Sequence, residues 1–119
     1  MAIVSTGPLE NNTVLGVRPT QLVTVKMVCR NTVNAVTVTI QGYVLGTTRT
    51  LYVNEMINIG PDEVVTRNYF ADLDAFEFVF TTGSGDVEAV GISVWGKQSS
   101  GQLVGTHRVV EHEKTSQGA

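Results

Sequence analysis

Few side chains in this 119-residue sequence could do chemistry, and the single thiol, Cys29, is the first to consider. A nucleophilic cysteine needs an accessible position and a neighbouring base. In the stretch LVTVKMVCR, however, Cys29 shares strand parity with Val25 and Met27, which predicts a small buried residue. The alternative, a thiol that cross-links neighbouring molecules, would require the opposite strand face or a strand end. We predict the buried position.

Two histidines lie close together near the end of the chain. His107 belongs to the strand-like segment LVGTHRVV, and His112 follows in a polar stretch between Glu111 and Glu113. A zinc site needs three or four ligands held in a fixed geometry. One histidine on a strand and another in a charged tail do not meet that requirement. The pattern favours a solvated tail over a metal centre.

Two further stretches, one with paired aspartates and one rich in glycine, have residue types that also occur in ligand sites. Asp72 and Asp74 are two residues apart, but Ca²⁺ takes six to eight oxygen ligands and this pair supplies too few. The run Gly83-Ser84-Gly85-Asp86 lacks the lysine and the following helix of a phosphate-binding loop. Both stretches are typical of turns between strands. The sequence therefore predicts a protein that is not an enzyme and that binds no metal and no cofactor.

The elements that position these residues are predicted to be strands. From residue 22 onward apolar and polar residues alternate with a period close to two, and Val, Thr, Ile, Phe and Tyr dominate. The segment AFEFVFTT is the clearest, and we expect its phenylalanines, with Phe70, to be core residues. The predicted strands are residues 22–30, 35–45, 51–59, 64–70, 75–82, 87–96 and 103–110.

These strands predict an all-β fold, an antiparallel jelly-roll-type sandwich of about seven or eight strands with an extended N-terminal arm. No long helical segment separates the strands, so parallel βαβ units are not expected. The immunoglobulin pattern of two cysteines around a tryptophan is absent, because Cys29 is alone and Trp95 comes late. We divide the chain into a connector arm (1–20), a β-sandwich domain (21–110) and a polar tail (111–119).

Composition limits the classes of partner. Charged residues make up 16% of the sequence, below the roughly 25% typical of soluble domains, which indicates that part of the surface is covered by a partner. The net charge of −3 and the scattered basic residues argue against nucleic acid or an anionic membrane as that partner. No apolar run reaches the length of a membrane span. The N-terminus lacks the pattern of a secretory signal peptide.

The N-terminal stretch MAIVSTGPLENNTVLGV has two short apolar patches separated by Gly7-Pro8 and Asn11-Asn12. Such a segment is suited to leave its own domain and add a strand to the sheet edge of a neighbour. The alternative is that residues 14–17 form the first strand of the domain and residues 1–8 are disordered. We predict the first arrangement, with these subunit-contact residues: Ile3, Val4, Pro8, Val14, Leu15 and Val17.

With this arm, a compact Val/Thr-rich strand series and no signal peptide, the sequence resembles the endospore appendage subunits of bacilli. The resemblance implies a jelly-roll subunit that polymerises head to tail through its connector into fibres on the spore surface, with anchor or tip proteins at the fibre ends. It also implies release by lysis of the mother cell in place of secretion. The arm has no cysteine, so the covalent cross-links of some such subunits are not expected here.

The predicted function is therefore a structural subunit of an extracellular, spore-associated fibre whose partner is a copy of itself. Two alternatives remain open. A viral or phage decoration or tube protein has the same combination of a sandwich and an arm. A carbohydrate-binding module would need Tyr43, Tyr52 and Trp95 to line one exposed groove.

Overall fold

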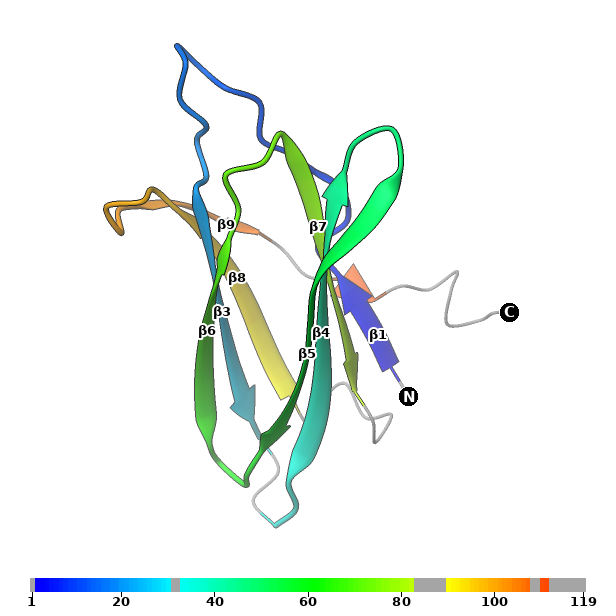
Figure 1. Ribbon diagram of the computed structural model, residues 1–119. Helices are drawn as coiled ribbons and strands as arrows, with labels where there is room; N and C mark the ends of the chain where they lie inside the picture. Colours follow the sequence, from blue (N-terminus) through cyan, green and yellow to red (C-terminus); the bar gives the residue numbers. More distant parts are fainter. Residues whose placement is uncertain (1, 31–32, 83–89, 108–109, 112–119) are drawn as a thin grey trace.

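Two antiparallel β-sheets pack face to face in the computed structural model of the chain, which describes residues 2–30, 33–82, 90–107 and 110–111. Figure 1 shows the two layers, with β3, β6, β8 and β9 in one and β1, β4, β5 and β7 in the other. The predicted all-β antiparallel sandwich is confirmed. The described residues form ten strands. Seven of them have five or more residues and correspond to the predicted segments, and the other three are shorter.

The larger sheet has six strands in the order β10-β1-β7-β4-β5, and β2 also pairs with β7. The smaller sheet has four strands in the order β6-β3-β8-β9. The strands of the larger sheet are β1 (Ala2–Ser5), β2 (Leu9–Glu10), β4 (Val36–Leu45), β5 (Arg49–Ile59), β7 (Ala75–Thr82) and β10 (Val110–Glu111). Those of the smaller sheet are β3 (Leu22–Cys29), β6 (Val64–Phe70), β8 (Val90–Lys97) and β9 (Leu103–His107).

The core lies between the sheets and is centred on Phe78 of β7, which is fully buried. Its ring lies 5.5–6.1 Å from the rings of Tyr69, Tyr52 and Phe76. Gly42 of β4 makes room for it, since a Cβ atom there would lie 2.9 Å from Phe78 Cε2. A glycine at the bulge between β4 and β5 thus allows the Phe78 ring to pack closely against the sheet at the centre of the core.

The structure confirms one core prediction and corrects another. Cys29 is fully buried, as its parity with Met27 predicted. Phe70 was expected in the core, but 58% of its surface is exposed. It lies at the end of β6, where the alternation places Tyr69 inward and Phe70 on the outer face of the smaller sheet.

A polar cluster joins β5 to β6 beside this core. The Tyr69 hydroxyl donates to Glu55 Oε1 at 2.6 Å, and Arg67 Nε donates to Glu55 Oε2 at 3.0 Å. The hydrogen bond from Tyr69, and then that from Arg67, lowers the pKa of Glu55 below its ordinary value of 4.5. Burial, followed by the bond to Glu55, raises the pKa of Tyr69 above 10.0, and burial raises the pKa of Tyr52 to about 12.

These shifts predict a stability that falls on both sides of neutral pH. The lowered pKa of Glu55 means that the unfolded chain takes up its proton first, so this contribution is present above pH 4.5 and is lost as the pH falls. The raised pKa values of Tyr52 and Tyr69 contribute stability below pH 10.0 that is lost as the pH rises. Urea midpoints measured against pH should show a shallower acid slope in Glu55→Gln, and an unchanged slope would contradict the assignment.

Candidate functional site

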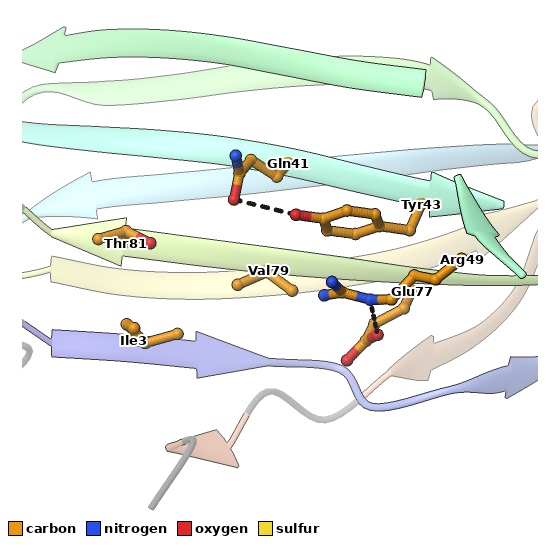
Figure 2. Close-up of a pocket in the computed structure, with 7 residues that line it drawn as sticks. All are labelled: Ile3, Gln41, Tyr43, Arg49, Glu77, Val79 and Thr81. Carbon is orange, nitrogen blue, oxygen red and sulfur yellow. Dashed lines mark hydrogen bonds and ion pairs between the residues drawn. The ribbon is translucent and has the colours of Figure 1, made fainter. Parts of the chain in front are cut away.

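The outer face of the larger sheet has an open groove of about 370 Å³. Figure 2 shows the groove with side chains from β1, β4 and β7, and with Arg49 from the start of β5. Within it, the Tyr43 hydroxyl donates to Gln41 Oε1 at 3.3 Å. The lining residues are Ile3, Gln41, Tyr43, Arg49, Glu77, Val79 and Thr81.

The one carboxylate of this groove, Glu77, is already engaged within the chain. The Ser5 hydroxyl donates to its Oε2 at 2.8 Å, and Arg49 Nε donates to its Oε1 at 3.4 Å. The Arg49 guanidinium also lies 3.5 Å from the centre of the Tyr43 ring, a cation–π contact. Both charges are thus neutralised locally, and the groove is a weakly charged surface with polar and apolar parts.

The first part of the predicted arm belongs to this same sheet. β1 pairs with β7 from Ala2↔Thr82 to Ser5↔Val79, and β2 continues the pairing at Leu9↔Phe76. Val4 is 6% exposed and packs in the chain's own core. The predicted separate arm over residues 1–20 is therefore not observed for residues 2–10, which belong to the chain's own sheet. Gly7, with a φ of +72°, lies in the short link between β1 and β2, and both strands run antiparallel to β7.

The predicted contact residues thus divide into two groups. Ile3 lines the groove of the larger sheet, Val4 is a core residue, and Pro8 is an exposed link between β1 and β2. Val14, Leu15 and Val17 lie elsewhere, in the segment between β2 and β3. Figure 1 shows that this blue segment extends beyond the ends of the strands.

Residues 14–17 form a protruding tight turn, which we call the Leu15 knob. Val14 N–H donates to Val17 O at 2.7 Å, and Val17 N–H donates to Val14 O at 3.1 Å. Leu15 and Gly16 have φ values of 53° and 82°, a combination typical of a type I′ turn. The alternative of a first strand over residues 14–17 is wrong, because this bridge is isolated.

The knob exposes apolar side chains to solvent. Leu15 is 100% exposed, Val14 61% and Val17 49%. A leucine in the left-handed region is also uncommon, because its side chain crowds the backbone there, and Asn or Gly is the usual occupant. A strained, fully exposed leucine is a reason to look for a function at this position.

The root of the knob is held by Asn11, which is 3% exposed. Its Nδ2 lies 2.7, 3.0 and 2.8 Å from the carbonyl oxygens of Thr20, Ala71 and Leu73, so its two hydrogens are shared among three acceptors. Its Oδ1 accepts from Thr20 N–H at 2.9 Å. One buried amide therefore joins both ends of the loop to the segment between β6 and β7.

Arg18 supplies a second anchor to that segment. Its Nη2 lies 2.8 Å from Asp74 Oδ1, and its Nη1 lies 3.2 Å from Asp72 Oδ1. The hydrogen bonds to Asp74 and then Asp72 raise the pKa of Arg18. The two aspartates that the sequence analysis weighed as cation ligands thus bind a guanidinium. They lie 56 and 54 residues from Arg18 in the sequence, so no local pattern reveals the contact.

A second depression, the Trp95 groove, lies on the outer face of the smaller sheet. Its volume is about 300 Å³ and its surface is largely apolar. Trp95 Nε1 donates to Ser93 Oγ at 3.0 Å, which fixes the indole beside Leu103, a residue that is 57% exposed. Lys26 and Lys97 flank it, and neither is in a salt bridge with another described residue. The lining residues are Thr24, Lys26, Ser93, Trp95, Lys97 and Leu103.

The three aromatic residues of the carbohydrate alternative are not brought together. Tyr43 lines the groove on the larger sheet, whereas Trp95 lines the one on the smaller sheet. Tyr52 packs edge-on against Phe78. As for the histidines, His107 ends β9 and His112 lies outside the described residues, as does the run Gly83–Asp86. The tail predicted at 111–119 is described only at Glu111, in β10.

Metal and membrane sites can be assessed only for the part of the chain that the structure describes. Its residues include no group of three or more His, Cys, Asp and Glu side chains placed to hold a metal ion. None of them forms a helix long and apolar enough to cross a bilayer.

Comparison with known proteins finds similarity among solved structures alone. The sequence matches no protein-family model and no curated protein. Among solved structures, the Anabaena sensory rhodopsin transducer is similar at 11% sequence identity and a TM-score of 0.48, over 82% of this chain and 93% of that chain. Values this low support no inference about fold or function.

Proposed function

We propose that this chain is a structural subunit that associates with copies of itself, and that the Leu15 knob is the element by which one copy contacts the next. The observation that supports this proposal is a fully exposed leucine, flanked by two exposed valines, on a loop whose root is tied down by Asn11 and Arg18. Apolar side chains so displayed lower their free energy when a partner covers them.

The free energy gained by burying the knob fits an assembly that depends on many repeated contacts. Burial of one leucine or valine side chain contributes roughly 1.5–3 kcal/mol. Association must overcome the loss of translational and side-chain freedom, and a preorganised loop reduces that cost. The knob is already folded and anchored, so little further ordering is needed. We therefore expect a modest affinity per contact and assembly that increases with concentration.

This proposal modifies the prediction that the N-terminal segment adds a strand to the sheet edge of a neighbour. β1 and β2 already complete the chain's own sheet, so donating them would require exchange of these strands between copies. The knob, in contrast, is available without any unfolding. A contact between two different surfaces of successive copies need not close, and it gives a fibre when the rotation between copies does not form a ring. The resemblance of the sequence to endospore appendage subunits makes the spore surface the proposed location.

The test is Leu15→Asn, because Asn-Gly is the pair that type I′ turns prefer. We expect this variant to keep or raise the thermal stability while it removes the apolar contact. Sedimentation velocity and negative-stain images at rising concentration should show assembly of the wild-type chain and monomers of Leu15→Asn.

The matched control is Met56→Asn, which changes another exposed apolar residue, 71% exposed on β5, and should assemble like the wild type. A wild-type chain that stays monomeric at every concentration would overturn the proposed function. Normal assembly of Leu15→Asn would instead remove the knob from it.

A further inference from the structure

We propose that the acceptor for the Leu15 knob is the Trp95 groove of the next copy. This inference rests on the proposed function, and it adds the partner surface. The groove is largely apolar, with Trp95 and Leu103 among its lining residues. Its volume of about 300 Å³ lies at the lower end of the range of roughly 300–1,000 Å³ for pockets that bind small molecules. A space of that size suits a few aliphatic side chains, which is what the knob exposes.

The charges around the two surfaces are complementary. The root of the knob carries the carboxylates of Glu10, Asp72 and Asp74 against the single guanidinium of Arg18. The Asp74 side chain is 66% exposed and Asp72 39%, so part of this negative charge faces solvent. The groove carries two ammonium groups, and none of its lining residues is acidic. Approach of the knob to the groove therefore brings opposite charges together around an apolar centre, which favours this docking orientation.

The positions of the two surfaces predict a head-to-tail assembly. The knob extends beyond one end of the sandwich (Figure 1), whereas the groove lies on the outer face formed by β3 and β8. Each copy would use its knob on one neighbour and its groove on another. Such a contact is heterologous, so subunits add one after another without a two-fold pair.

Mixing two variants tests this directly. Leu15→Asn removes the knob and leaves the groove, and Trp95→Ala impairs the groove and leaves the knob. Each variant alone should stay monomeric at concentrations at which the wild type assembles. An equal mixture should form dimers that contain one of each variant and grow no further, as sedimentation velocity and native mass spectrometry would report.

Charge reversal provides a second groove variant in case Trp95→Ala fails to fold. Lys97→Glu should also block assembly alone, because the new carboxylate in its groove would repel Asp72 and Asp74 beside an incoming knob. Its own knob is unchanged, so it should still pair with Leu15→Asn. If both groove variants assemble like the wild type, the acceptor is wrong, while loss of assembly in Leu15→Asn would still uphold the proposed function. If the mixture of two monomeric variants stays monomeric, the pairing of these two surfaces is overturned.

Cross-linking gives a positive signal. In the double variant Val17→Cys with Ser93→Cys, which keeps Leu15, mild oxidation of the assembled protein should give a ladder of disulfide-linked oligomers, because Val17 is exposed on the knob and Ser93 lines the groove. The native Cys29 is fully buried and should not compete. The control pair Met56→Cys with Ser93→Cys should give no ladder. A ladder in the control and none in the first pair would contradict the inference.

Discussion

Replacing Asn11 with aspartate should lower the free energy of unfolding by about 3 kcal/mol or more. The Asn11 amide nitrogen lies within 3.0 Å of three main-chain carbonyl oxygens, and an aspartate would present an ionised oxygen to them. A carboxylate donates no hydrogen bond, so these acceptors would lose their donor while a charge is buried at a position that is 3% exposed.

Urea denaturation of Asn11→Asp and Asn12→Asp provides the comparison. Asn12 is the exposed neighbour, and its change should cost less than about 0.5 kcal/mol. Because a protonated aspartate regains one donor, the deficit of Asn11→Asp should shrink as the pH falls below the pKa of this carboxyl group. Equal stabilities of the two variants would show that Asn11 does not anchor the loop.

Phe78→Ala should cost about 3–5 kcal/mol of folding free energy, the largest value expected for a single truncation here. Phe78 is fully buried, and three aromatic rings surround it at 5.5–6.1 Å. Its neighbour across the sheet is Gly42, which has no side chain with which to fill the resulting space.

Phe70→Ala is the matched control, since it removes the same atoms from a ring that is 58% exposed. Its cost should be a small fraction of the value for Phe78→Ala. Calorimetric unfolding of both variants measures the difference. Similar losses would place Phe70 in the core after all and contradict the arrangement of β6.

The strands were predictable because their pattern is local. An alternation of apolar and polar residues specifies both a strand and its buried face, and this is enough to predict Cys29 as buried. In VVTRNYF the alternation separates Tyr69 from Phe70 but leaves the buried face open, because each face combines a valine with polar residues and one aromatic residue. The structure places Tyr69 inward, where it bonds Glu55 and packs near Phe78.

The N-terminal segment shows what local patterns leave open. Ile3 and Val4 have the apolar character of a strand, but nothing near them specifies whether they pair with β7 of the same chain or of another. The structure pairs them within the chain. The knob was predicted as an apolar contact patch, but its turn was not, since Leu15 is an unusual residue for a left-handed position and only Gly16 indicates the turn.

The anchors of the knob were missed for a different reason. Asn11 contacts Ala71 and Leu73, which are 60 and 62 residues away in the sequence. Asparagine and aspartate are ordinary loop residues, so their identity alone predicts a turn. Only the packing of two distant loops converts them into a hydrogen-bonded root.

The loop that carries the knob is also tied to the strand end that carries the groove. Gln21 N–H donates to Lys97 O at 2.8 Å, Ser99 N–H donates to Gln21 Oε1 at 2.7 Å, and Gln98 Nε2 donates to Pro19 O. In a fibre built by the proposed contact, force passing from one neighbour to the next would cross each subunit through these bonds, without a flexible linker. Bending such a fibre would therefore be resisted by folded loops within each subunit, so we expect its flexibility to lie in the contacts between subunits.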